Sequence, residues 1–260
     1  MSYFYVFGTD KRTEYIKLMI KEEGRLTEDS SLAKHIVAPT PFTKDNENVF
    51  GTDISINTFI NKCKGKIVFA GAIPGFVKEK LEAGEVEYYD LMEYEDVAIL
   101  NAIPTAEGAI SVAMEMSDIT LHGSNVLVLG FGKIGKVLSK MLLGIGTNVY
   151  CEARNKKDLA LIKALGYNSI DLRDLDKYLP KFDYVFNTIP YLILDEIRLA
   201  RLKKDAYLID LASKPGGIDF DYAKNNGMNV THALALPSKV APKTAALYFK
   251  QKIDYIINNI

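Results

Sequence analysis

Three glycines, Gly130, Gly132 and Gly135, have the clearest chemical meaning in the chain, and they lie in the stretch "VLVLGFGKIG". An apolar run that predicts a strand (124–130) precedes them, and an amphipathic run that predicts a helix (133–146) follows. In this context the glycines permit a tight turn, the approach of a pyrophosphate and close helix packing, while the helix N-terminus offers free N–H groups. We therefore predict a dinucleotide site that includes Gly130, Phe131, Gly132, Lys133, Ile134 and Gly135.

The next predicted strand (148–153) decides which dinucleotide is favoured. In NAD-binding domains a carboxylate ~20 residues beyond the glycine loop binds the ribose 2′-hydroxyl. Here that position is Ala153, and Glu152 should face the other side of the sheet because side chains alternate along a strand. A small neutral residue followed by cations suits the 2′-phosphate of NADP, so NADP is predicted and NAD is disfavoured. The alternative is that this basic run is only a solvated helix start. The cofactor residues assigned here are Arg154, Asn155 and Lys156.

Further polar residues follow other predicted strands, in "NTIP" (187–190), "LASKPGG" (211–217) and "LPSKVAPKTA" (236–245). The carboxyl ends of parallel strands meet at one edge of a sheet, where ligands bind in open α/β folds. Turn-rich loops can also lack any ligand role, and this alternative stays open. The residues assigned to the cofactor from these loops are Asn187, Thr188, Ile189, Pro190, Ala212 and Ser213. The same loops also carry Lys214, Lys243 and Thr244.

The elements that must position these residues alternate between strand and helix, which predicts an α/β fold with parallel sheets. We predict two Rossmann-like domains, residues 1–100 and 121–240, joined by a hinge helix (101–120) that has Pro104 in its first turn. A C-terminal helix (241–260) should pack back on the first domain. The predicted strands are 3–8, 35–41, 66–74, 85–92, 124–130, 148–153, 182–190, 206–213 and 228–237.

Composition excludes several other classes. The 260 residues have a net charge of −1, which gives no electrostatic reason to bind nucleic acid. The two cysteines form no CxxC motif, so neither a disulfide framework nor a zinc site is predicted. The first residues do not read as a signal peptide, and no apolar run is predicted to reach the ~20 residues of a bilayer span, so a membrane role is not expected.

The three histidines, His35, His122 and His232, are expected to be structural or exposed, because none is predicted at the carboxyl edge of a sheet. A dehydrogenase of the 2-hydroxy-acid type needs a histidine–carboxylate pair there, which disfavours it. A shikimate-type dehydrogenase needs a lysine–aspartate pair, and that alternative stays open. So does a regulatory protein that binds NADP without catalysis. No metal-ligand spacing is present.

Five segments between residues 98 and 250 resemble the A subunit of bacterial dipicolinate synthase: "NAIPTAEGAI", "HGSNVLVLGFGKIG", "NTIP", "LASKPGGIDF" and "VAPKTA". The resemblance implies a sporulation enzyme of the mother-cell cytoplasm that oxidises dihydrodipicolinate to pyridine-2,6-dicarboxylate. It also implies a flavodoxin-like partner, the B subunit of that enzyme, and assembly into a homo- or hetero-oligomer.

A dianionic substrate of this kind needs cations around it, and its oxidation needs a group or a water that accepts a proton. Under this interpretation the catalytic candidates are Glu107, Lys214 and Lys243. The substrate-binding candidates are Asp10, Arg12, Asn101, Thr105, Lys214, Lys243 and Thr244.

Overall fold

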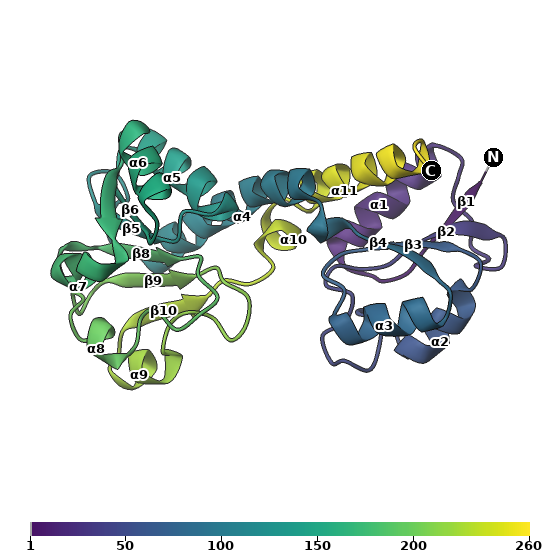
Figure 1. Ribbon diagram of the computed structural model, residues 1–260, viewed down its shortest axis with the longest axis horizontal. Coiled ribbons are helices and arrows are strands. Elements are labelled where there is room, and N and C mark those ends of the chain that lie inside the picture. Colours follow the sequence, from purple (N-terminus) through teal and green to yellow (C-terminus); the bar gives the residue numbers. More distant parts are fainter. Residues whose placement is uncertain (1) are drawn as a thin grey trace. The chain divides into compact units, whose positions relative to one another are not determined.

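The computed structural model describes residues 2–260, which divide into two compact units. Unit 1 comprises the chain up to Asn101 together with Pro237–Ile260, and unit 2 is Ala102–Leu236. Each unit contains one wholly parallel sheet covered by helices (Figure 1). The prediction of an α/β fold with two parallel sheets is therefore confirmed.

The sheet of unit 1 consists of β1 (Tyr3–Val6), β2 (Ala33–Val37), β3 (Ile67–Ala70) and β4 (Glu87–Asp90), in that order. On its outer side β1 also pairs with Leu26 through a single parallel bridge. The Phe4 N–H donates to Arg25 O at 2.8 Å, and the Thr27 N–H donates to Phe4 O at 2.9 Å. The chain therefore leaves β1 toward one edge of the sheet and continues from β2 toward the other.

This reversal places helices on both faces of the unit 1 sheet (Figure 1). One core contains side chains of α1 (Lys11–Glu22) and α11 (Pro242–Ile257). The other contains those of α2 (Ile56–Cys63) and α3 (Gly75–Ala83). In open sheets the point where strand order reverses is where ligands bind, and here it lies between the carboxyl ends of β1 and β2.

The C-terminal helix α11 packs on α1, as predicted. The Lys250 ammonium is buried between these helices, where it lies 2.5 Å from the Glu23 carboxylate and 2.6 Å from that of Asp254. A buried ammonium is tolerated because both partners are carboxylates. The bond to Glu23 holds the last helix against the first, and the bond to Asp254 lies within α11.

The hinge helix differs from its prediction. The helix α4 (Glu95–Met116) begins before residue 101, and Pro104 lies inside it instead of in its first turn. The unit boundary, between Asn101 and Ala102, also falls inside this helix. By length and composition α4 is apolar enough to cross a membrane, contrary to the expectation that no run would reach that length. Half of the most apolar stretch of α4 is buried inside the protein, as expected of a core helix.

The sheet of unit 2 has the strand order β10-β9-β8-β5-β6-β7, with all strands parallel. This is the order of dinucleotide-binding domains, with the reversal between β5 and β8. One strand was not predicted at all, the edge strand β7. The bounds are β5 (Asn125–Leu129), β6 (Asn148–Ala153), β7 (Asn168–Asp171), β8 (Tyr184–Asn187), β9 (Tyr207–Asp210) and β10 (Asn229–His232).

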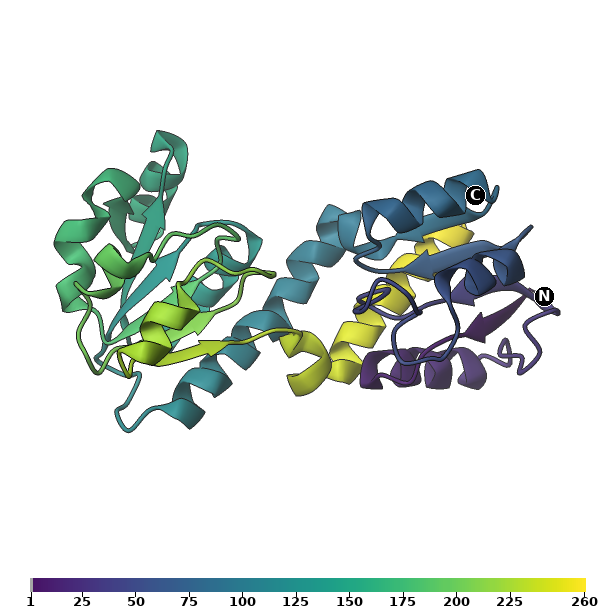
Figure 2. The same cartoon turned by 90° about the horizontal axis from the view of Figure 1, so that it is seen from below.

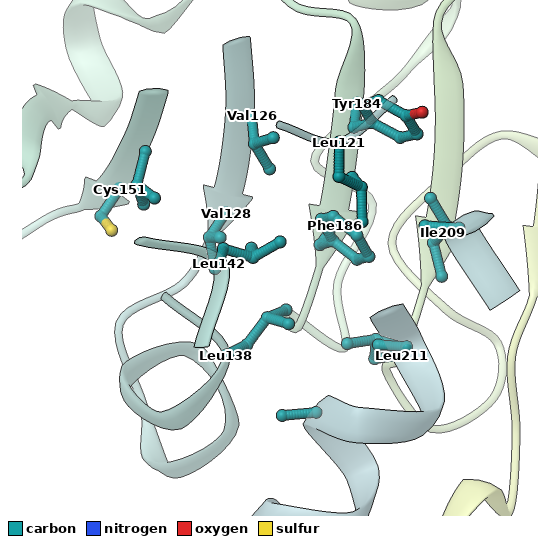
Figure 3. Packing of buried hydrophobic residues seen from close by; sticks show 14 of the residues in the cluster. Leu121, Val126, Val128, Leu138, Leu142, Cys151, Tyr184, Phe186, Ile209 and Leu211 are labelled. Carbon is teal, nitrogen blue, oxygen red and sulfur yellow. The ribbon is translucent and has the colours of Figure 1, made fainter. Parts of the chain in front are cut away.

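Helices cover both faces of the unit 2 sheet (Figures 1 and 2). On one face, α4 and α5 (Lys133–Ile145) pack on Val128, Phe186 and Ile209, all fully buried (Figure 3). Burying each such side chain contributes ~1.5–3 kcal/mol. The remaining helices of the unit are α6 (Lys156–Ala164), α7 (Leu175–Tyr178), α8 (Glu196–Leu199) and α9 (Phe220–Asn225), and α10 (Leu236–Val240) lies at the boundary.

The core of unit 1 contains a titratable group, His35 on β2. Its ring is 2% exposed, lies 4.9 Å from the Phe4 ring centroid, and has no hydrogen-bond partner at Nδ1. Burial lowers the pKa of His35 to about 4.

The unfolded chain accepts a proton on this ring near the ordinary histidine pKa, whereas the folded chain does not. Stability is therefore expected to fall as the pH drops from about 6.5 toward 4, by up to roughly 3 kcal/mol. In His35→Phe this loss should shrink, as measured by urea unfolding at about pH 7.5 and about pH 5. The exposed His122 supplies the control substitution. An unchanged pH dependence in His35→Phe would contradict the assignment.

Candidate functional site

The glycine loop at the end of β5 is shaped by two steric constraints. A Cβ on Gly135 would lie 2.1 Å from the Gly130 carbonyl oxygen, so α5 can approach β5 this closely only without a side chain. Gly130 has φ +88°, and a Cβ there would lie 2.6 Å from Thr188 Oγ1. Both positions therefore require glycine for the fold itself.

Gly132 is different, because a Cβ built on it meets nothing within 4 Å. It is exposed and serves as the N-cap of α5, and no side chain caps this helix. The first-turn N–H groups and the positive end of the helix dipole are thus left for a ligand. The bare surface at Gly132 and the uncapped helix fit the pyrophosphate of a dinucleotide. The Phe131 ring is buried in the core near Tyr167, Lys133 is exposed and Ile134 is half-buried.

Glu152 lies beneath this loop, 1% exposed. Its Oε2 accepts a hydrogen bond from the Gly130 N–H at 3.2 Å, and its Oε1 has no partner among the described residues. Burial raises the pKa of Glu152. The carboxylate therefore supports the glycine loop from inside the protein instead of facing solvent.

The residues after Glu152 line a surface depression of about 510 Å³. Ala153 ends β6 with its side chain buried, and Arg154 and Lys156 are exposed. Asn155 caps α6, because its Oδ1 accepts from the Asp158 N–H at 2.8 Å. Asp171, Leu172 and Arg173, which sequence reasoning missed, complete the depression. Asp171 ends β7, the strand that was not predicted, and the other two residues follow it.

At the carboxyl ends of β8 and β9, Asn187 and Asp210 form a buried network. The Asn187 Nδ2 donates to Asp210 Oδ1 at 2.8 Å and to the Ile189 carbonyl at 2.9 Å. The Asp210 carboxylate also accepts from the N–H groups of Ala212 and Gly217, at 2.9 and 2.7 Å. Asn187 is fully buried. Its amide therefore positions the loops. The expectation that Asn187 leaves the buried run is wrong, and its contact with the cofactor stays a prediction.

The other predicted loop residues differ in accessibility. Thr188 is half-buried and its Oγ1 donates to the Leu129 carbonyl at 2.8 Å, which ties the loop after β8 to β5. Ala212 is buried, whereas Pro190, Ser213 and Lys214 are exposed. Ile189 is half-buried and packs against the core.

One histidine does reach the carboxyl edge, contrary to the sequence interpretation. His232 is the last residue of β10, and its Nε2 lies 2.7 Å from the Ala212 carbonyl oxygen. Its ring stacks on Phe220 with centroids 5.0 Å apart. These contacts give His232 a role in holding the loop 211–217.

In unit 1 the residues after β1 are less available than predicted. Asp10 is the N-cap of α1 and accepts from the backbone N–H groups of Arg12 and Thr13, at 3.1 and 3.3 Å. Arg12 is 4% exposed, so it does not lie on an open surface. Its Nη2 donates to Ser238 Oγ at 3.0 Å, and its guanidinium carbon lies 4.7 Å from the Phe249 ring centroid. Burial lowers the pKa of Arg12 to about 10.

The remaining candidates lie on helices. Thr105 is buried and Asn101 half-buried on α4, where Glu107 is exposed. Lys243 and Thr244 are exposed in the first turn of α11. Within residues 2–260 no cluster of acidic, histidine and cysteine side chains is arranged to hold a metal ion.

The fold and the glycine loop of unit 2 are those of a dinucleotide-binding domain. A family model for the NAD-binding domain of D-isomer specific 2-hydroxyacid dehydrogenases matches residues 102–215. D-lactate dehydrogenase from Salmonella shares the fold, with a TM-score of 0.68 and 13% identity over 98% of this chain and 96% of that chain.

More specific similarity extends over both units. The crystal structure of the dipicolinate synthase A subunit from Bacillus halodurans matches with a TM-score of 0.89 and 28% identity, over 98% of this chain and 97% of that chain. The A subunit of dipicolinate synthase from Bacillus subtilis is 36% identical over 194 residues. That alignment spans 75% of this chain and 65% of the relative, slightly less than two thirds of its length. The chain is a homologue of the dipicolinate synthase A subunit.

The different surroundings of the glycines lead to a paired prediction. In Gly132→Ala the new methyl group enters open space, so Tm should change by no more than about 2 °C. The same methyl occupies the space left for a pyrophosphate, so the affinity for dinucleotide should fall at least about tenfold.

In Gly135→Ala the methyl collides with the Gly130 carbonyl, and Tm itself should fall. Thermal unfolding and titration with NADPH fluorescence measure the two effects. Normal dinucleotide affinity in Gly132→Ala would mean that the ligand lies elsewhere.

Proposed function

We propose that the chain oxidises dihydrodipicolinate to dipicolinate (pyridine-2,6-dicarboxylate) with NADP as the oxidant, as the A subunit of a dipicolinate synthase. The observation that carries this proposal is the similarity to the A subunit from Bacillus halodurans, which extends over 98% of the chain. The bare glycine loop of unit 2 supports a dinucleotide cofactor independently.

The bound nicotinamide would accept the hydride, and the gain of aromaticity in the product favours the reaction. The chain's own residues then need to orient a dianion and accept one proton. Lys214 and Lys243 are exposed cations on predicted site loops, and each carries a charge suited to a carboxylate. Because the Asp10 carboxylate is engaged in capping α1, Glu107 is the better proton acceptor of the two acids, with water as the alternative.

NADP in preference to NAD is supported by the end of β6. Ala153 supplies no carboxylate for a ribose 2′-hydroxyl, and Glu152 is buried under the glycine loop. Arg154 and Lys156 carry exposed positive charges at the edge of the adjoining depression, which suit a phosphate.

The similarity also supports assembly with a flavodoxin-like B subunit and a role in the mother-cell cytoplasm during sporulation. Under this proposal the chain works in a homo- or hetero-oligomer. Reconstitution with the B subunit tests the partnership directly.

Substituting Arg154 by alanine should weaken NADPH binding about tenfold and leave NADH binding nearly unchanged, because only NADPH carries the 2′-phosphate. Fluorescence titration with each coenzyme measures both constants. Arg201→Ala, which removes an exposed arginine near the amino end of β9, is the control. Equal affinity of the unsubstituted chain for the two coenzymes would refute the NADP preference.

Alanine at Lys214 or at Lys243 should each lower kcat/KM for dihydrodipicolinate about tenfold, because each removes a cation from a dianionic substrate. The assay follows the absorbance of the pyridine product with NADP or NAD, with and without the B subunit. Lys204→Ala, an exposed lysine before β9, should retain full activity. If no product forms under any of these conditions with the unsubstituted chain, the proposed reaction is wrong.

A further inference from the structure

The carboxylate that is missing from the end of β6 has a counterpart on the neighbouring strand. In the parallel pairing of β6 with β7, Ala153 lies directly beside Asp171. Residues in register on adjacent strands project to the same face of the sheet. Asp171 therefore places a carboxylate beside the position where NAD-binding domains carry one. It also lines the depression that Arg154 and Lys156 line.

The charge of this carboxylate is compensated by Arg173. The Arg173 Nε donates to Asp171 Oδ1 at 2.9 Å, its Nη2 lies 2.5 Å from Oδ2, and its backbone N–H donates to Oδ1 at 3.0 Å. These hydrogen bonds lower the pKa of Asp171 to about 2, so it is ionised at neutral pH. The Asp171 side chain is 18% exposed and that of Arg173 is 79% exposed. The carboxylate is thus held in place by a guanidinium that solvent reaches.

We propose that the Asp171–Arg173 pair determines which coenzyme the depression accepts. The proposal rests on the dinucleotide site proposed above and adds a selectivity element to it. With the pair formed, three of the roughly four acceptor sites of the Asp171 carboxylate are already used by Arg173, which weakens it as an acceptor for the 2′-hydroxyl of NAD. Its negative charge is also neutralised, so a 2′-phosphate is not repelled. Both effects favour NADP.

Arg173 also contributes positive charge of its own. Arg154 and Lys156 have no ion-pair partner within the part of the chain that the structure describes. With Arg173 they give the depression three cations against one carboxylate, that of Asp171. A phosphate dianion entering there meets an excess of positive charge, and the exposed guanidinium is able to share its donors between carboxylate and phosphate.

The test is a double-mutant cycle with Arg173→Ala, Asp171→Asn and the double variant. Removing Arg173 leaves an uncompensated carboxylate beside the 2′ position, so the ratio of NADPH to NADH affinity should fall at least about fivefold. In the Asp171→Asn background the same substitution should have a smaller effect, because no carboxylate is then exposed. Asparagine also preserves the cap on the turn that follows β7, and Arg173 is exposed, so each variant should fold.

Coenzyme affinities are measured by NADPH and NADH fluorescence, and adenosine 2′,5′-bisphosphate and AMP serve as fragments that differ only in the 2′-phosphate. The matched control is Lys177→Ala, which removes an exposed ion pair to Asp174 that does not line the depression. This control should leave the affinity ratio unchanged.

A smaller fall in the ratio for Arg173→Ala, or an equal fall in the Asp171→Asn background, overturns the proposal. An unsubstituted chain that binds neither coenzyme overturns both this proposal and the cofactor assignment. A chain that binds coenzyme but does not oxidise dihydrodipicolinate refutes only the proposed reaction, because the affinity ratio is still measured.

Discussion

The close contact between the end of β5 and the start of α5 is the constraint on which the rest of unit 2 depends. A side chain at Gly135 would overlap the Gly130 carbonyl, so strand and helix meet at a distance that only glycine allows. The Glu152 carboxylate holds the Gly130 N–H from below, and Thr188 ties the loop after β8 to β5. The loop is therefore fixed by its neighbours on both adjacent strands, and Gly132 is left bare for a ligand.

A second constraint lies at the carboxyl edge of β8 and β9. A fully buried carboxylate is costly unless hydrogen bonds satisfy it, and Asp210 accepts from the Asn187 amide and from two backbone N–H groups. These bonds join the loop after β8 to the loop after β9. Ser213 and Lys214 are exposed at the tip of the loop after β9, and the hydrogen bonds to Asp210 fix the two ends of this loop. A fixed loop of this kind suits the precise positioning of a substrate.

The alternation of apolar runs with amphipathic ones was sufficient to predict two parallel α/β units, and the spacing of three glycines located the dinucleotide loop. The edge strand β7 was missed because "NSID" is short and half polar, and an edge strand needs no continuous apolar run. The start of α4 was misplaced because a proline is common in the first turn of a helix, whereas Pro104 lies inside this one.

Roles that depend on contacts between distant segments could not be predicted. The sequence suggested that Asn187 and Arg12 are exposed binding groups, but both are buried. Their hydrogen-bond partners, Asp210 and Ser238, lie far away in the sequence, so the local pattern could not reveal these contacts. His232 looked like the interior of a strand, but the strand ends there. Local patterns reveal a side chain's chemistry, whereas its accessibility is a property of the tertiary structure.

The position of β7 at the border of its sheet has an evolutionary consequence. The side chain of Arg173 is largely in solvent, and replacing it removes little buried surface. Under the role proposed for the Asp171–Arg173 pair, coenzyme preference could therefore change by substitution at this edge strand, without compensating changes in the hydrophobic core. Gly135 has no such freedom, because a side chain there would overlap the Gly130 carbonyl oxygen.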